Sequence, residues 1–415
     1  MPLRRRAATV LAAATALTAL TAPAALAAAP PTGLYGSGDP TYDGVWRQSY
    51  ALLALHTAGV VPAASATGWL TGQQCADGGF PSYRANTATP CAPKAEDTNA
   101  TGIAVQALTA LGGQDAAVGK ATAWLKKVQN ADGGWSYNPG GPSDPDSTAV
   151  VLGAFAATGT APQDVRTAGG KSPYDALRGF QSGCAAKAAD RGAFTYPMNG
   201  KKAVNAKATA DAVRASQGAG FVVRPAGSDV TADAPACTGA ATGADPYTVL
   251  APKASGLAGA AWLAAQLTAG GGHLTALTPG ADKPTPDYGT TADAVVALAA
   301  GGQRSAATSA YTWLAANSAT WAHGNPAALA QLILAAEATG ADPKSAGGAN
   351  LVQQLTNLGP APESAKPSPT PTATQEQHKK SSSGSSLGTW LIVGVIFVAS
   401  IGFGILLSSR KRRQG

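Results

Sequence analysis

The sequence predicts an all-α protein built from an array of helix pairs, and three observations lead to this prediction. An apolar helical pattern of the type Thr-Ala-x-Ala recurs six times, beginning at residues 48, 101, 148, 209, 291 and 326. Each copy is followed by a second helical stretch, so the pairs repeat at roughly 50-residue spacing. Alternating β-branched residues, which would indicate strands, are almost absent.

Residues 124–155 contain one complete repeat unit. A helix that includes Trp124 ends at Asp132 and the two glycines after it, because glycine favours turn conformations. A polar loop follows, and a second helix begins near Asp146 and Ser147. Asp and Ser commonly accept hydrogen bonds from the free N–H groups of a first helical turn. Capping is therefore the favoured interpretation of Asp146 and Ser147.

The two ends of the chain predict a protein held at the cell membrane by a single span. Residues 1–29 have the basic start, apolar middle and small-residue cleavage site of a signal peptide. Residues 361–386 are a linker rich in Pro, Ser and Thr, residues 387–409 a transmembrane helix, and residues 410–415 a basic cytoplasmic tail. Residues 30–360 are then an extracellular folded domain.

The charge of the folded part argues against a nucleic-acid partner. The whole chain carries a net charge of +7, but ten of its 30 Lys and Arg residues and only two of its 23 acidic residues lie outside residues 30–360. The excess therefore belongs to the ends of the chain. Lys201, Lys202 and Lys207 form a basic cluster, for which a solvated loop is the favoured interpretation. No heptad pattern or apolar patch predicts an oligomer, so we expect a monomer.

The four cysteines favour disulfides, because an even number of cysteines outside the cell usually pairs. We favour Cys75 with Cys91 and Cys184 with Cys237, and the other two connectivities remain open. No C-x-x-C pair or close Cys/His cluster occurs, so no metal site is expected.

Two loop motifs resemble a known repeat. Residues 124–135, which read Trp-Leu and then Gln-Asn-Ala-Asp-Gly-Gly-Trp, and residues 75–80, Cys-Ala-Asp-Gly-Gly-Phe, resemble the repeat of terpene (squalene) cyclases and protein prenyltransferase β-subunits. The resemblance covers nearly all of residues 30–360. It implies an α/α toroid in which six inner helices are ringed by six outer ones. Extracellular cobalamin carriers share that fold, so the fold alone leaves the function open.

The candidate site follows from the direction of the loops. If all Asp-Gly-Gly loops enter the inner helices from one end, their aromatic and polar side chains collect around one mouth, which suits a bulky, partly apolar ligand. The first aromatic of each loop, as in Phe80, Trp135 and Phe194, is expected to pack inside the protein. The candidate ligand-binding residues are Tyr83, Asp97, Tyr137, Asp146, Ser147, Tyr196, Tyr288, Trp321 and His323.

The favoured function is a non-catalytic binding protein. The resemblance to cobalamin carriers implies a corrinoid-type nutrient as ligand and a membrane transporter as partner, with no other cofactor. The chain lacks the second, β-rich domain of those carriers, and the insert at residues 219–252 is the candidate for a small lid.

The alternative function is a terpene cyclase-like or prenyltransferase-like enzyme. Residues 144–149, Asp-Pro-Asp-Ser-Thr-Ala, resemble the Asp-x-Asp-Asp-Thr-Ala motif of cyclases that protonate an alkene, which implies Asp146 as the proton donor. Ser147 stands where the motif has a second carboxylate. In the other repeats Asn99, Lys207 and Gly289 occupy the position of Asp146, which favours the capping interpretation over catalysis.

Overall fold

The computed structural model describes residues 32–92, 94–198, 200–237, 245–277 and 282–363, which belong to one compact unit. These residues are about half helical. The described α-helices are α1 (Gly44–Thr57), α2 (Ala64–Gly72), α3 (Thr98–Leu111), α4 (Asp115–Lys127), α5 (Pro145–Ala157), α6 (Pro173–Arg178), α7 (Ala206–Ser216), α8 (Pro252–Ala269), α9 (Tyr288–Ala300), α10 (Arg304–Asn317), α11 (Ala319–Ala322), α12 (Pro326–Thr339) and α13 (Leu351–Thr356).

Three antiparallel two-stranded sheets and three short 3-10 helices complete the described secondary structure. The strand pairs are β1 (Phe80–Pro81) with β2 (Glu96–Asp97), β3 (Thr195–Met198) with β4 (Lys201–Val204), and β5 (Thr275–Ala276) with β6 (Thr285–Pro286). The 3-10 helices are η1 (Pro162–Asp164), η2 (Ala188–Asp190) and η3 (Pro246–Val249).

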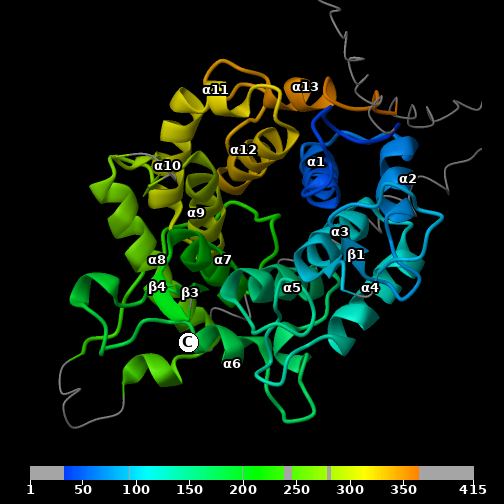
Figure 1. The fold of residues 1–415 in the computed structure, drawn as a ribbon. Helices are drawn as coiled ribbons and strands as arrows, with labels where there is room; N and C mark the ends of the chain where they lie inside the picture. The colour runs from blue at the N-terminus through cyan, green and yellow to red at the C-terminus, as the bar shows by residue number, and fades with distance from the viewer. Residues whose placement is uncertain (1–31, 93, 199, 238–244, 278–281, 364–415) are drawn as a thin grey trace, which may run out of the picture. The chain divides into compact units, whose positions relative to one another are not determined.

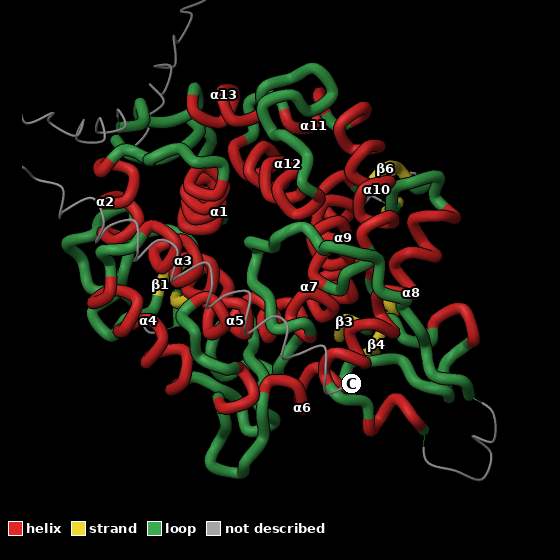
Figure 2. The backbone as a smooth tube through the Cα atoms, turned by 180° about the vertical axis from the view of Figure 1, so that it is seen from behind, coloured by secondary structure: helices red, strands yellow, loops and turns green. Residues whose placement is uncertain are grey.

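Six helices form the centre of the fold. Helices α1, α3, α5, α7, α9 and α12 pack against one another in that order, and α12 also packs against α1, so their contacts close a cycle. Figures 1 and 2 show these helices around a common centre, with the remaining helices outside them. Small residues permit the close packing: a Cβ at Gly102 of α3 would lie 2.9 Å from Val150 Cγ1 of α5.

The threonine of the Thr-Ala-x-Ala pattern joins each central helix to the loop before it. The Oγ1 atoms of Thr101, Thr148, Thr209 and Thr291 accept hydrogen bonds of 2.9–3.1 Å from the backbone N–H of Phe80, Trp135, Phe194 and Leu274, respectively. A buried loop N–H needs such a partner. Phe80, Trp135 and Phe194 are fully buried, which confirms that the first aromatic of each of these loops packs inside the protein.

The glycines of the Asp-Gly-Gly loops are required by a close approach. Gly133 has φ +94°, a left-handed conformation that favours glycine, and a Cβ there would lie 2.2 Å from the carbonyl oxygen of Ser172. Gly78 has φ +109°, and a Cβ there would lie 2.3 Å from the carbonyl oxygen of Lys120. Each loop therefore fits closely against the segment of the next repeat.

The predicted fold class, an all-α toroid with six inner and six outer helices and a C-terminal transmembrane helix, is wrong as stated. The described part of the chain has 13 α-helices of uneven length, from the four residues of α11 to the 18 of α8, and it also contains three sheets. The two-residue strands of β1, β2, β5 and β6 are too short to produce an alternating pattern, which is why the sequence did not reveal them.

No helix in the described ranges is both long and apolar enough to span a bilayer. The predicted transmembrane helix at residues 387–409, like the signal peptide, most of the linker and the basic tail, lies outside the described residues.

The predicted cysteine pairing is confirmed. Cys75 is bonded to Cys91, and Cys184 is bonded to Cys237. The first disulfide closes the loop between α2 and β2. The second ties the loop after α6 to the long segment between α7 and α8.

Candidate functional site

Five of the six central helices begin at an Asp or Asn whose side chain caps the helix, and α1 does not. The side chains of Asp97, Asp144, Asn205, Asp287 and Asn325 accept hydrogen bonds from the first free N–H groups of α3, α5, α7, α9 and α12. Asp144 accepts from both the backbone N–H and the hydroxyl of Ser147, each at 2.7 Å. The interpretation of Asp146 as a cap is therefore wrong, because Asp144 fills that role and Ser147 serves it as the donor.

The residue two positions after each cap faces a different environment. Asn99, Asp146 and Lys207 hold this position in α3, α5 and α7, and all three line one pocket with a volume of about 290 Å³. The first turns of α1, α3, α5 and α7 form its walls. The residue type at this position differs between the repeats, and in the sequence this difference favoured the capping interpretation. In the structure, the differing side chains line the pocket.

Asp146 enters this pocket without a hydrogen-bond partner. Its Oδ1 is shielded from solvent, and no donor in the described residues lies within hydrogen-bond distance of it. Burial, together with the charge of Asp211, raises the pKa of Asp146 to about 7, and Lys207 opposes the shift. Asp146 is therefore partly protonated at neutral pH.

An ionic cluster lies at the base of the pocket. Lys207 forms an ion pair with Asp211 one turn further along α7, and its Nζ lies 3.3 Å from Asp293 Oδ2 of α9. Arg214 Nη2 contacts Asp211 Oδ1 at 3.0 Å. Desolvation lowers the pKa of Lys207, but the three nearby aspartates outweigh it, so the pKa lies well above its ordinary value. Lys207 is thus a charged cation held by carboxylates.

The upper wall of the pocket is aromatic and polar. Ser82 Oγ lies 3.3 Å from both Asp97 Oδ2 and the hydroxyl oxygen of Tyr137. Burial raises the pKa of Asp97. Tyr42 and Trp46, before and within the first turn of α1, complete the wall. The mouth therefore joins aromatic faces to acceptor groups, as predicted for Asp97, Tyr137 and Asp146.

Phe221 occupies the centre of the fold beyond this base. Its ring lies 4.9 Å from that of Tyr50 and 5.9 Å from that of Trp46, and the Arg214 guanidinium carbon lies 4.0 Å from its centroid. The backbone N–H of Phe221 donates to Gln106 Oε1 at 2.9 Å. Its segment, residues 218–226, lines a second cavity together with the carboxyl ends of α1, α3, α5, α9 and α12. The prediction that this segment covers the mouth of the pocket is therefore wrong. The segment lies at the carboxyl ends of the central helices, whereas the pocket lies at their first turns.

The remaining predicted residues are not brought to this pocket's lining. Tyr83 stacks on Trp69, with ring centroids 6.3 Å apart. Tyr196 lies on β3, near enough to Asp144 and Asp146 for their charges to add to the effect of burial and raise its pKa. Tyr288 and Trp321 stack on each other at 5.7 Å, and Tyr288 also stacks on Trp313.

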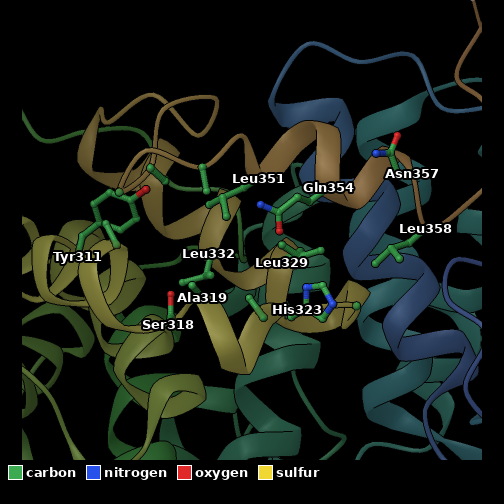
Figure 3. Close-up of a pocket in the computed structure, with 16 residues that line it drawn as sticks. Tyr311, Ser318, Ala319, His323, Leu329, Leu332, Leu351, Gln354, Asn357 and Leu358 are labelled. Atoms are coloured by element: carbon green, nitrogen blue, oxygen red, sulfur yellow. The ribbon is translucent and has the colours of Figure 1, made fainter.

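His323 belongs to a separate cavity. It is exposed at the end of α11 and lines a mainly apolar space of about 560 Å³ between α10, α11, α12 and α13 (Figure 3). Figure 3 shows Leu329 and Leu332 of α12 facing Leu351 and Gln354 of α13 across this space. The predicted site residues are therefore divided among several places.

Several residues of the pocket were missing from the predicted site, including Tyr42, Trp46 and Ser82. Four others are polar residues on the central helices: Asn99, Lys207, Asp211 and Asp293. Each lies two or six residues after the cap of its helix. Residues four positions apart lie on the same face of an α-helix, so these positions share one face. Comparing the repeats at these spacings would have found them. Lys207 belongs to the site rather than to a solvated loop, whereas Lys201 and Lys202 are exposed on β4.

No metal-binding group emerges from the described residues. Their one close set of potential ligands is Cys75, Cys91 and Glu96, and the two sulfur atoms are bonded to each other in a disulfide. A metal ligand would need free thiolates. Comparisons of the chain with protein-family models and with curated proteins found no match.

Proposed function

We propose that this protein is a non-catalytic binding protein that holds a partly apolar small molecule in the pocket between α1, α3, α5 and α7. The observation that carries this proposal is the unpartnered Asp146 carboxyl in the pocket wall. Buried polar atoms normally have a hydrogen-bond partner, so a missing partner calls for an explanation. A bound ligand supplies one, and Tyr42, Trp46 and Tyr137 offer the apolar contacts that such a ligand needs.

The two disulfides support a location outside the reducing cytoplasm. A binding protein in that location captures nutrients or signals, and transfer to a membrane transporter stays a prediction from the sequence.

The pocket volume argues for a ligand smaller than a corrinoid. A corrinoid macrocycle does not fit inside about 290 Å³ and would have to lie across the mouth. We therefore propose a compact ligand with one apolar part and one polar group that reaches Asp146.

Acid catalysis by Asp146 is the second candidate, because a carboxyl with a pKa of about 7 holds a proton at neutral pH. The same observation weakens the cyclase hypothesis, since a raised pKa makes a weaker acid and protonation of an unactivated alkene needs a strong one. Ser147, which stands where the cyclase motif has its second carboxylate, donates its hydroxyl to Asp144 and cannot act as that carboxylate. Binding without turnover is the better-supported function.

A screen of partly apolar metabolites tests the proposal. We expect some compounds to raise the melting temperature of the folded domain and to quench tryptophan fluorescence. Tyr42→Ala should weaken these hits several-fold, because Tyr42 is 85% exposed at the rim and its loss does not affect the core. Trp321→Ala, outside the pocket lining, is the matched aromatic control.

The hits should be recovered unchanged after prolonged incubation. If the protein converts a hit to a product and the Asp146→Asn variant does not, the protein is an enzyme and the proposed non-catalytic function is refuted. Hits that respond to Trp321→Ala but to no pocket variant would refute the proposed site.

A further inference from the structure

The pocket and its base contain more carboxylates than cations. Asp97, Asp146 and Asp211 line the pocket, and Asp293 lies beside Lys207. Lys207 and Arg214 are the cations in ion pairs with members of this group. A further cation brought by a ligand would therefore be attracted to the pocket.

Both protein cations are already engaged. Lys207 is shared between Asp211 and Asp293, and Arg214 contacts Asp211 and lies over the Phe221 ring. Neither forms an ion pair with Asp146 among the described residues. Lys207 lowers the pKa of Asp146 only from beyond ion-pair distance, so the described residues offer Asp146 no directly paired counter-charge.

The free atoms of the pocket wall are acceptors. Asp146 Oδ1 and the amide oxygen Oδ1 of Asn99 are both buried, lack a hydrogen-bond partner and belong to side chains that line the pocket. The two residues hold equivalent positions in the adjacent helices α3 and α5. A ligand group with two or more N–H donors suits these two acceptors once their side chains turn toward the cavity. A carboxylate or phosphate would face Asp97 and Asp146, and Lys207, the one cation among the described lining residues, is already paired with Asp211 and Asp293.

The aromatic wall suits the same ligand. Trp46 and Tyr137 line the pocket together with the carboxylates, and Tyr42 stands at its rim. Aromatic faces attract organic cations and pack against apolar carbon. The pocket can therefore hold both the apolar part and the cationic group of one ligand.

We propose that the ligand is a small organic cation with N–H donors, a primary ammonium or amidinium on an apolar body, whose head group binds Asp146 and Asn99. This inference rests on the proposed binding function and specifies its ligand class. It also assigns Asn99 as a ligand-binding residue.

Three matched probes test the inference: phenethylamine, 2-phenylethanol and 3-phenylpropionate, which share a phenyl body and differ in the head group. Affinities are measured at pH 8 by ligand-observed NMR and tryptophan fluorescence on the folded domain. We expect the amine to bind about tenfold more tightly than the alcohol, because its ammonium forms charge-assisted hydrogen bonds with the carboxylate. The carboxylate probe should bind more weakly than either.

Asp146→Asn should weaken the amine far more than the alcohol, so that the preference for the amine disappears. Asp115→Asn, which removes an exposed carboxylate in the first turn of α4, is the charge-matched control and should change neither affinity. If Asp146→Asn does not fold, Tyr42→Ala replaces it, and it should weaken the amine and the alcohol alike.

The outcomes separate this inference from the proposed function. If the alcohol or the carboxylate binds best and Tyr42→Ala weakens it, the binding function stands and the cationic ligand class is refuted. If the amine preference survives in Asp146→Asn, the assigned head-group site is refuted. If no probe binds and no metabolite hit responds to the pocket variants, the binding function itself fails.

Discussion

Residues 75–155 and residues 273–323 follow the same repeat pattern but use it differently. In the first region the loop aromatic Trp135 is buried, and Tyr137 two residues later turns its hydroxyl toward Ser82 beside the pocket. In the second region the aromatics stack on one another: His273 on Trp313 at 4.0 Å, and Tyr288 on Trp313 at 5.5 Å. The position of Asp146 is held there by Gly289.

The difference shows that the repeated residues determine the backbone, whereas the variable residues determine the chemistry. The Thr Oγ1 acceptor and the Asp cap recur in both regions. The pocket lies beside the first region because Asp146 and the half-exposed Tyr137 line open space there, together with residues of α1 and α7. Four changes test this comparison, from the largest expected effect to the smallest.

Replacing the buried loop aromatic should cost the most stability. Trp135 is fully buried, packs on Phe155 at 6.0 Å and donates from Nε1 to the Leu125 carbonyl oxygen at 2.8 Å. We expect Trp135→Ala to lower the free energy of unfolding in urea by about 4 kcal/mol. Trp321→Ala, in the partly exposed stack of the second region, should cost only about 1 kcal/mol. Equal costs would mean that the two regions do not differ in packing.

Removing the disulfide of the first region should cost about 3 kcal/mol. Cys75 and Cys91 are separated by 16 residues, and closing a loop of this length restricts the unfolded chain by about that amount. Residues 273–323 contain no cysteine, so their loops have no such constraint. The Cys75→Ser/Cys91→Ser double variant is compared with wild type by urea unfolding without reductant. Unchanged stability would show that hydrogen bonds alone hold the loop.

Asp146→Asn should stabilise the protein above neutral pH. The folded-state pKa of Asp146, about 7, exceeds its ordinary value of 3.8, so the folded state binds this proton more tightly than the unfolded state. The associated stability is complete below about pH 4 and is lost as pH rises through 7. A pKa shift from 3.8 to about 7 corresponds to roughly 4 kcal/mol at pH 8, and the buried amide of Asn would itself lack a partner, which costs part of that gain. We therefore expect Asp146→Asn to gain about 2 kcal/mol at pH 8 and almost nothing at pH 4.

Urea unfolding across this pH range measures the effect, with Asp115→Asn as the control. Part of the pH dependence should remain in Asp146→Asn, because burial and Asp77 also raise the pKa of Glu96 to about 7. A loss of stability at pH 8 would contradict the assignment of Asp146 as a residue without a structural partner.

The cap positions should show the smallest effect and no difference between the regions. Asp144 accepts from the N–H and hydroxyl of Ser147, and Asp287 accepts from the same two groups of Thr290. We expect Asp144→Ala and Asp287→Ala each to cost about 1 kcal/mol in thermal or urea unfolding. A large effect in one region only would show that the caps are not equivalent.

Much of the architecture was predictable because it depends on local patterns. The helix pairs, the loop turns, the buried first aromatics and the disulfides each follow from residue types at fixed spacing. The three sheets and the uneven helices were not predictable, since two-residue strands form from the geometry of the returning loops. In the site, Asp97, Tyr137 and Asp146 line the same pocket, and their role in ligand binding stays a prediction. Asp146 was assigned to the cap by composition alone.

The sequence by itself determined where this chain bends, which faces of its helices are apolar and which cysteines are available to pair, since these depend on neighbours along the chain. Only the tertiary structure decided that Asp144 caps α5, leaving Asp146 in the pocket, and that Lys207 lies among carboxylates from α7 and α9. The physical reason is that the charge balance of a buried group depends on groups far away in sequence, which burial and the low local dielectric make decisive.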